Sequence, residues 1–265
     1  IVSDSGPTYV DWENPENNTF HLALEVTCQN EGDEFRPDIV IFINGLPLSY
    51  IEVKQPNAIR DGKTAIQSEQ SRTAVRFENR RFRRFNNITQ LISFSDNLPY
   101  ISGQGQQKQG SFYCSNAFSK TKFNAFKEER EEELIYSIRS LGEEEIDAVL
   151  KDVNRFALKS QPEFKTNQDP STPCNTFISS LYQKERLLFL LRYGLAYVEE
   201  HSKDGTIQLQ KHVMRYPQFF ATKAIEDAIG KGVKKGVIWH TQGSGKTALS
   251  YFNIRYLTNY FSKQG

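Results

Sequence analysis

The chain has 265 residues, and its 33 Lys and Arg against 32 Asp and Glu give a net charge of +1, so any contact with nucleic acid must be local. There is no signal peptide and no apolar run long enough to span a membrane, and we expect a cytoplasmic protein. The three cysteines lack a CxxC pair, which favours reduced thiols over disulfides or a zinc site. The opening Ile1-Val2-Ser3-Asp4 is not a translation start, so we expect a piece of a longer protein.

Residues 36–54 contain two apolar, strand-like runs joined by Asn-Gly, the strongest short signal for a β-hairpin. Asp38 precedes the first run, and Glu52 and Lys54 end the second. Side chains alternate along a strand, so Glu52 and Lys54 point the same way. A strict two-residue turn would pair Asp38 with Ile51 and send Asp38 and Glu52 to opposite faces. A shared site therefore requires a three-residue loop or a β-bulge.

These three residues have the chemistry of a metal-dependent phosphodiesterase. Carboxylate oxygens are the ligands that Mg²⁺ prefers, and Asp38 and Glu52 would leave positions for water and for a phosphate oxygen. The Lys54 ammonium would orient the water or neutralise charge developing on the phosphate. The alternative is a solvated strand face, which the acid-x-lysine triplet alone would favour. The nearly continuous apolar residues around it favour buried strands, where a charge is costly unless a metal or partner uses it.

The same N-terminal region predicts further elements. Hydrophobic periodicity favours a helix over 60–77, and apolar runs favour strands at 91–94 and 100–101. The Gly/Gln-rich segment 102–110 is typical of a surface loop. A basic stretch offers either a DNA contact or an amphipathic helix with solvated arginines and inward aromatic rings. Its members are Arg72, Arg76, Phe77, Arg80, Arg81, Phe82, Arg83, Arg84 and Phe85.

The middle of the chain predicts a helical connector. Acidic runs at 128–133 and 143–147 suit solvated helix faces, and the turn-rich segment 161–173 suits a loop between helices. Apolar residues then recur at helical spacing, and this region is assigned no chemistry. They are Leu181, Leu187, Leu188, Leu190, Leu191, Leu195 and Val198.

Residues 236–257 predict a phosphate-binding loop, formed by a short apolar strand, a glycine-containing turn and a helix that opens with Lys-Thr. Glycines let backbone N–H groups surround a phosphate, the lysine reaches the β- and γ-phosphates of ATP, and the threonine hydroxyl binds Mg²⁺. The strict pattern asks for glycine where the chain has His240. The residues that would bind nucleotide are Gly243, Ser244, Gly245, Lys246 and Thr247.

The wording of these segments gives a specific resemblance. Arg-Pro-Asp-Ile-Val-Ile-Phe-Ile-Asn-Gly-Leu-Pro-Leu at 36–48 and Ile-Glu-Val-Lys-Gln-Pro-Asn at 51–57 look like the PD-(D/E)xK nuclease motif. They resemble the restriction (R) subunit of type I restriction-modification enzymes. His-Thr-Gln-Gly-Ser-Gly-Lys-Thr at 240–247 resembles the motor loop of the same family.

The resemblance implies that Asp38, Glu52 and Lys54 are catalytic, with the two carboxylates binding Mg²⁺. It also implies a glutamine on the following helix, which Gln67 matches best. Gln218, within Arg-Tyr-Pro-Gln at the start of a predicted helix, corresponds to the family's adenine-recognising glutamine.

The resemblance further implies an α/β fold. A restriction-endonuclease-like mixed β-sheet flanked by helices would occupy 1–110, a helical region completing or connecting the nuclease domain 111–205, and the first strand, loop and helix of a RecA-like motor 206–265. Partners would be double-stranded DNA and the methylation and specificity subunits, with ATP-driven translocation before cleavage. Because the later motor motifs are not in this chain, we expect it alone to hydrolyse ATP negligibly. The alternatives are a repair or recombination nuclease-helicase and a non-catalytic scaffold that binds DNA or nucleotide.

Overall fold

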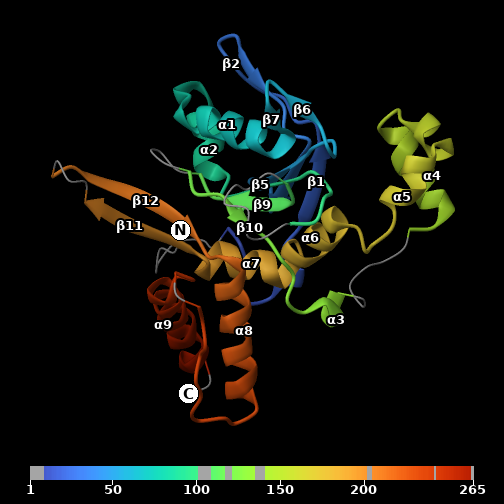
Figure 1. Cartoon of the computed structure of the whole chain (residues 1–265). Helices are drawn as coiled ribbons and strands as arrows, with labels where there is room; N and C mark the ends of the chain where they lie inside the picture. Colours follow the sequence, from blue (N-terminus) through green and yellow to red (C-terminus); the bar gives the residue numbers. More distant parts are fainter. Residues whose placement is uncertain are drawn as a thin grey trace.

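The computed structural model describes residues 9–100, 109–116, 121–134, 141–201, 205–241 and 243–263. Within these residues the main sheet is mixed and has six strands in the order β1-β4-β5-β8-β9-β10 (Figure 1). β5 and β8 are parallel, and the other neighbouring pairs are antiparallel. The strands are β1 (Phe20–Leu24), β4 (Ile39–Ile43), β5 (Leu46–Val53), β8 (Leu91–Ser95), β9 (Ser111–Cys114) and β10 (Asn124–Ala125).

Helices cover both faces of this sheet. α1 and α2 lie on one face and α6 and α7 on the other, while α8 and α9 extend the second layer beyond the sheet (Figure 1). The described helices are α1 (Ala65–Glu78), α2 (Arg83–Ile88), α3 (Glu131–Leu134), α4 (Glu143–Asp152), α5 (Pro162–Asn167), α6 (Pro173–Leu181), α7 (Lys184–Tyr193), α8 (Tyr216–Gly230) and α9 (Lys246–Ser262). Short 3-10 turns occur at Pro15–Asn17, Arg80–Phe82 and Phe156–Ser160, and small hairpins are β2/β3 (Cys28–Asn30, Asp33–Phe35), β6/β7 (Ile59–Arg60, Lys63–Thr64) and β11/β12 (Leu195–His201, Ile207–Val213).

The two layers explain why the central strands are apolar throughout. Ile41 and Ile43 of β4 pack with the α6 and α7 residues, whereas Val40 packs with Phe77 of α1 on the opposite face. A strand buried on both faces needs apolar side chains at successive positions, not at alternate ones. This is the mixed sheet flanked by helices that fits a restriction-endonuclease-like domain, as the sequence predicts.

The β4–β5 hairpin contains the bulge that a shared site requires. Asn44 and Gly45 form a two-residue turn with φ values of 50° and 81°, the left-handed region that such turns need. Next to the turn the register is that of a strict hairpin, but farther along the pairing skips Leu48. Continued by one pair, this register places Asp38 opposite Glu52.

The predicted helical spacing of Leu195 and Val198 is wrong, because both residues lie in β11. α7 ends at Gly194, where a Cβ atom would come within 2.8 Å of the carbonyl oxygen of Leu190. The chain then enters a hairpin that projects from the body of the molecule (Figure 1). Tyr197 and Val198 are residue types that favour a strand, and this preference competes with the helical spacing of Leu195 and Val198.

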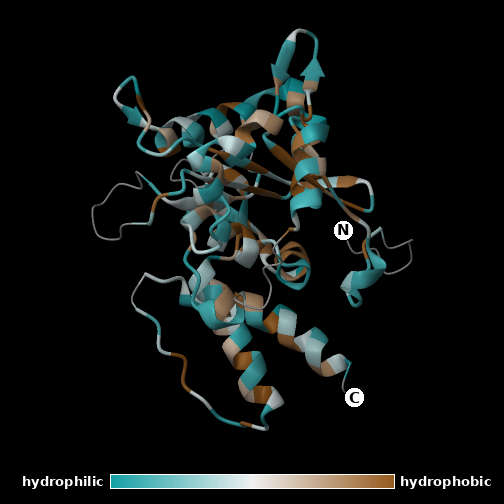
Figure 2. Cartoon of the chain, turned by 90° about the vertical axis from the view of Figure 1, so that its right-hand side faces the viewer, coloured by the Kyte–Doolittle hydropathy of each residue, from teal (hydrophilic) through white to brown (hydrophobic). Residues whose placement is uncertain are grey.

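α8 and α9 are present, but the strand predicted before the loop is not. Residues 233–241, all of them described, form no strand, and Val237 and Trp239 are 89% and 90% exposed. In Figure 2 this connection between α8 and α9 runs outside the body and carries a hydrophobic stretch. A strand must pair its backbone with a neighbour, and no described strand pairs with this segment. The fold therefore does not show the start of a RecA-like motor.

Other expectations have mixed outcomes. The sheet does not end at residue 110, since β9 and β10 belong to it, and the predicted loop 161–173 contains α5. Tyr100 lies in no strand, and residues 101–108 lie outside the described part. All three cysteines are free, as expected. Among the described residues no helix is long and apolar enough to cross a membrane.

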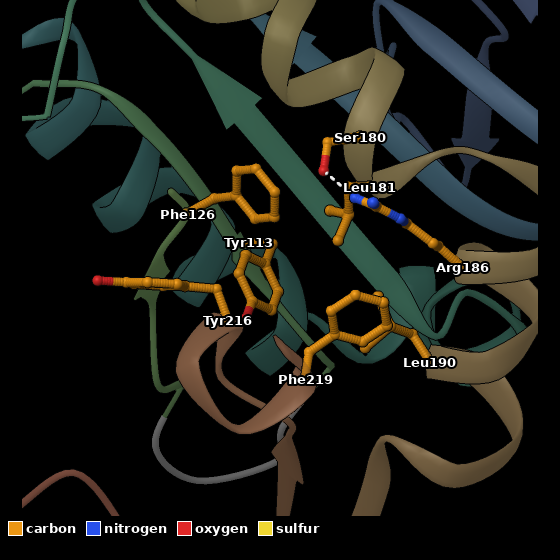
Figure 3. A pocket seen from close by; sticks show the side chains of 8 residues that line it. All are labelled: Tyr113, Phe126, Ser180, Leu181, Arg186, Leu190, Tyr216 and Phe219. Atoms are coloured by element: carbon orange, nitrogen blue, oxygen red, sulfur yellow. Dashed lines mark hydrogen bonds between the residues drawn. The ribbon is translucent and has the colours of Figure 1, made fainter. Parts of the chain in front are cut away.

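A buried junction joins the sheet to α8. The Tyr113 hydroxyl of β9 donates a hydrogen bond to the Met214 carbonyl oxygen at 2.7 Å. Arg186 of α7 donates to Glu128 Oε2 at 2.8 Å and lies over the ring of Phe219 in α8. A cavity lined in part by Tyr113, Arg186 and Phe219 measures about 10 Å³, which approaches the lower limit for a single water molecule (Figure 3). It is too small to hold a substrate.

Candidate active site

Asp38, Glu52 and Lys54 converge on the face of the sheet that α1 covers. Lys54 Nζ lies 2.5 Å from Glu52 Oε2 and 3.9 Å from Asp38 Oδ2. Asp38 Oδ2 also accepts a hydrogen bond from the Val53 N–H at 2.7 Å, which holds the carboxylate against the neighbouring strand. The bulge at Leu48 therefore brings Asp38 onto the same face of the sheet as Glu52 and Lys54, which a strict hairpin would not do.

Helix α1 adds two charged side chains that sequence reasoning did not assign to this site. Arg76 Nη1 lies 3.1 Å from Glu52 Oε1 and 3.0 Å from Glu69 Oε1. Lys54 Nζ lies 3.1 Å from Glu69 Oε2. The side chains of Glu52 and Glu69 are 4% and 0% exposed, so these contacts are made away from bulk water. In such surroundings each ion pair is stronger than at the surface, and each unpaired charge costs more.

The electrostatics of this group favour a further cation. Burial raises the pKa of Glu52, and the neighbouring Glu69 carboxylate raises it further, although Lys54 and Arg76 offset part of the effect. Burial alone would lower the pKa of Lys54, but the carboxylates of Glu69 and Glu52 outweigh it and raise the pKa above its ordinary value. Lys54 is therefore held as an ammonium ion, and the negative charge of Glu52 is only partly compensated.

Asp38 and Glu52 fit a hard, well-hydrated cation. The part of the chain that the structure describes holds no cluster of three or more His, Cys, Asp or Glu side chains able to bind a metal. Mg²⁺ does not need such a cage, since it usually keeps several waters and takes one or two protein carboxylates. The Lys54 ammonium, within 4 Å of both carboxylates, marks the space between them as one that accepts positive charge.

Gln67, the glutamine that the resemblance assigns to the nuclease site, contacts Thr64 in the structure. Its Oε1 accepts a hydrogen bond from the Thr64 N–H at 3.1 Å, and its own N–H donates to Thr64 Oγ1 at 3.3 Å, so Gln67 caps the start of α1. Glu69, two residues later, lies on the inward face instead. The signal was the helical stripe of Ile66, Glu69, Thr73 and Phe77, which puts an acid among residues that face the sheet.

The basic stretch contains both core residues and exposed arginines. Phe77 and Phe82 are buried and Phe85 is partly buried. Phe77 packs against the main sheet, and the rings of Phe82 and Phe85 pack on Phe35 of β3, so none of the three is available to stack on bases. Arg81 pairs with Asp33 at 3.3 Å. Within the basic stretch, the exposed arginines that make no ion pair with any described residue are Arg80, Arg83 and Arg84.

The loop at the start of α9 has the local geometry of a phosphate cradle. Gly243 and Gly245 have φ values of 78° and 85°, and Lys246 begins the helix, as predicted. Lys246 Nζ donates to the carbonyl oxygens of His240 and the next residue at 3.1 and 3.2 Å. The buried Ser244 Oγ has no hydrogen-bond partner among the described residues. Turned amides, a helix N-terminus and a lysine are groups that suit a nucleotide phosphate.

Gln218 contacts this loop with its side chain. Its Nε2 donates to the Gly245 carbonyl oxygen at 3.0 Å, and its Oε1 accepts from the Arg215 N–H at 2.9 Å. Gln218 is buried, and both atoms of its amide are used within the protein. The side chain therefore links α8 to the loop, while the predicted reading of an adenine edge would require it to exchange these partners. Thr247 lies exposed in the first turn of α9.

Two family models match parts of this chain. Residues 4–132 match the family model described as "Type I restriction enzyme R protein N terminus". This part of the chain is similar to the N-terminal part of type I restriction enzyme R proteins. Residues 217–264, which include α8 and α9, match a second model, described as "SWI2/SNF2 ATPase".

Relatives with type I restriction enzyme names cover nearly all of this chain. From Methanocaldococcus jannaschii, the "Putative type I restriction enzyme MjaVIIP endonuclease subunit" is 29% identical over 261 residues, which are 96% of this chain and 20% of the relative. The "Type I restriction enzyme HindI endonuclease subunit" of Haemophilus influenzae is 27% identical over 251 residues, 92% of this chain and 19% of the relative. The chain thus spans about a fifth of the length of the curated relatives it matches.

Proposed function

We propose that this chain is the nuclease and nucleotide-binding part of a type I restriction enzyme R subunit, and that it hydrolyses double-stranded DNA with Mg²⁺. The observation that carries this proposal is the convergence of Asp38 and Glu52 beside Lys54 through one bulged hairpin. Relatives named as endonuclease subunits support the same class of reaction.

Different residues of the chain would bind the metal, assist the reaction and contact the DNA. Asp38 and Glu52 would hold Mg²⁺, which when bound supplies Lewis acidity toward water and phosphate. Lys54, kept charged by its carboxylate neighbours, would orient the attacking water and stabilise charge that develops on the scissile phosphate. The exposed Arg80, Arg83 and Arg84 would contact the DNA backbone through phosphates, so binding would weaken as salt rises.

The loop at the start of α9 would bind ATP with Mg²⁺. Gly243 and Gly245 would turn backbone amides toward the phosphates, with Lys246 at the β- and γ-phosphates and Thr247 at the metal. The match to an ATPase model supports this assignment. In the whole protein, ATP-driven translocation would precede cleavage, and methylation and specificity subunits would supply target recognition.

The nuclease proposal is tested by nicking of supercoiled plasmid in the presence of Mg²⁺. We expect Asp38→Asn and Lys54→Gln each to slow nicking at least about 100-fold, because each removes a group that acts on the transition state. The matched controls are Asp152→Asn and Lys165→Gln, which change the same residue types at exposed positions in α4 and α5. EDTA should abolish nicking by the unchanged chain.

Nicking that survives either site variant would contradict the assignment of that residue. Nucleotide binding without any Mg²⁺-dependent nicking, in the chain and in a complex reconstituted with methylation and specificity subunits, would instead favour a non-catalytic scaffold.

A further inference from the structure

Four charged side chains form a closed ring beneath α1. Arg76 Nη1 bridges Glu52 Oε1 and Glu69 Oε1 at 3.1 and 3.0 Å. Lys54 Nζ bridges the other two oxygens, Glu52 Oε2 and Glu69 Oε2, at 2.5 and 3.1 Å. Each cation thus contacts both carboxylates, and each carboxylate contacts both cations.

Glu69 is fully occupied within this ring. Its Oε1 also accepts from the Thr73 hydroxyl at 3.3 Å, and its Oε2 is 3.4 Å from Arg72 Nη1 at the rim. An ionised carboxylate has about four lone-pair directions, so Glu69 has a donor for each of them. Its side chain is also completely buried, which leaves no access for a further ligand.

Glu52 differs from Glu69 in the number of its donors, although its side chain is also nearly buried, at 4% exposed. Within the described residues it has one donor on each oxygen, Lys54 and Arg76, so lone pairs on both oxygens remain for another cation. It also stands next to Asp38 in the hairpin register, whereas Glu69 comes from the helix above. The two carboxylates therefore share the same cations but have unequal capacity to bind a third one.

The net charge of the group explains why the charge of Glu69 matters for cation binding at Glu52. Asp38 and the four side chains of the ring together have three carboxylates and two cations, Lys54 and Arg76, and so carry a net charge of −1. Arg72 adds a third cation only at the rim of Glu69, where its exposed side chain is screened by water. Without Glu69 the same group would be neutral, and Glu52 would be the only buried carboxylate left to compensate both cations. A divalent cation approaching Glu52 would then meet two poorly compensated positive charges at close range.

We propose that Glu69 is a positioning residue, the counter-ion that retains Lys54 and Arg76 so that Glu52 and Asp38 remain available to bind a divalent cation. This role rests on the proposed nuclease function and adds to it a residue from outside the hairpin. Glu69 does not touch substrate or metal in this role. It acts through the two side-chain cations that it holds.

The test measures binding of Mg²⁺ by calorimetry, and of Tb³⁺ by luminescence with Mg²⁺ as competitor, without any DNA. Glu69→Gln keeps the shape but removes the charge, and we expect affinity for Mg²⁺ to fall at least about tenfold. The double variant Glu69→Gln with Arg76→Gln restores the net charge of −1, and we expect it to recover most of the lost affinity. Glu69→Asp keeps the charge, so its affinity for Mg²⁺ should be closer to that of the unchanged chain than the affinity of Glu69→Gln is.

The matched control is Glu78→Gln, which removes the charge of an exposed glutamate at the end of the same helix. We expect it to leave affinity for Mg²⁺ unchanged. Circular dichroism establishes that each variant is folded. If Glu69→Gln alone does not fold, the charge-balanced double variant and Glu69→Asp still decide the question.

The outcomes separate this inference from the proposed function. If the unchanged chain binds no divalent cation at Asp38 and Glu52, the nuclease proposal itself fails. If it binds Mg²⁺ and Glu69→Gln binds equally well, only the role of Glu69 is overturned. The role of Glu69 would also be overturned if the double variant bound Mg²⁺ more weakly than Glu69→Gln alone. A purely structural role of Glu69 predicts this result, because a second buried substitution would disturb the site further.

Discussion

Lys211 is a buried lysine whose ammonium is held by neutral groups. It lies in β12, and its Nζ donates to Asn116 Oδ1 at 2.5 Å and also to the side-chain oxygen of Gln90. Amide oxygens satisfy hydrogen bonds but bring no negative charge, so burial lowers the pKa of Lys211 to about 8. The charged form is thus retained in the folded protein at a cost in free energy that Lys54, with its carboxylates, does not incur.

This predicts a pH dependence of stability. Lys211 loses its proton near pH 8 when folded but only near 10.5 when unfolded, so between these values it makes the free energy of unfolding rise with pH. We expect this contribution of Lys211 to be on the order of 2 kcal/mol from pH 8 to about 10. Burial raises the pKa of Cys114 and of Tyr50, so these groups oppose the rise above about pH 9 and pH 10, where they ionise in the unfolded chain alone.

The measurement is urea unfolding at several pH values, with Lys211→Met as the comparison. The free energy of unfolding of the variant should lack the contribution that rises from pH 8 to about 10, because its side chain does not titrate. This holds whatever the stability of the variant at pH 7. An equal slope in both proteins would show that Lys211 is not the group responsible.

At the scale of elements, α8 and α9 meet through one tight contact. A Cβ atom at Gly245 would come within 2.5 Å of Gln218 Nε2, and the φ of 85° is itself unfavourable for other residues. Gln218 in turn fills this contact with its hydrogen bond to the Gly245 carbonyl oxygen. The position of the loop before α9 relative to α8 therefore depends on the absence of a side chain at Gly245.

We expect Gly245→Ala to destabilise the chain by about 1–2 kcal/mol more than Gly232→Ala. Gly232 also has a positive φ, 78°, but a Cβ atom there would meet nothing within 4 Å, so the difference isolates the clash with Gln218. Urea unfolding of the two variants gives the comparison. Equal losses would mean that the backbone conformation, and not the contact between the helices, decides the cost.

At the scale of the whole molecule, the layer under the sheet continues into α8 and α9. One cluster of buried residues includes Ile41 and Leu91 of the sheet, Leu187 of α7, Phe219 of α8 and Phe252 of α9. The hydrogen bond from β9 to the segment before α8 crosses the same junction. Within the described residues, the main sheet and the helices α8 and α9 therefore share one core.

We therefore expect the sheet and the two last helices to unfold in a single calorimetric transition. Phe219→Ala, at the junction, should lower the free energy of unfolding by about 3 kcal/mol and shift the whole transition. Phe261→Ala, at an exposed position of α9, should change it little. Two resolved transitions, with only one affected by Phe219→Ala, would contradict a continuous core.

The parts that sequence reasoning could predict depend on local signals. Asn44-Gly45 specifies its turn through positive φ at both residues, and the spacing of apolar residues specifies α1. The bulge was also predictable, because side chains alternate along paired strands and a strict two-residue hairpin would place Asp38 and Glu52 on opposite faces. Lys246 at the start of α9 followed from the glycines before it.

The remaining parts depend on which faces meet in three dimensions. Gln67 and Glu69 are two residues apart on one helix, and only the position of α1 over the sheet decides which of them reaches Lys54. The apolar residues of β11 fit a helix or a strand equally, and the end of α7 at Gly194 decides between them. The predicted strand at 236–241 had the right composition but no described partner strand to pair with.

The bulge at Leu48 also limits how this hairpin can change in length. A two-residue turn alone would pair residues an odd number of positions apart in the sequence. The unpaired Leu48 makes this number even, and Asp38 therefore lies opposite Glu52. An insertion or deletion of two residues, one from each strand, would keep them on the same side. A change of one residue would turn one carboxylate to the other side of the sheet unless a bulge were gained or lost with it. In related hairpins, an odd difference in the spacing of these two acids therefore predicts a gained or lost bulge, whereas an even difference predicts longer or shorter strands.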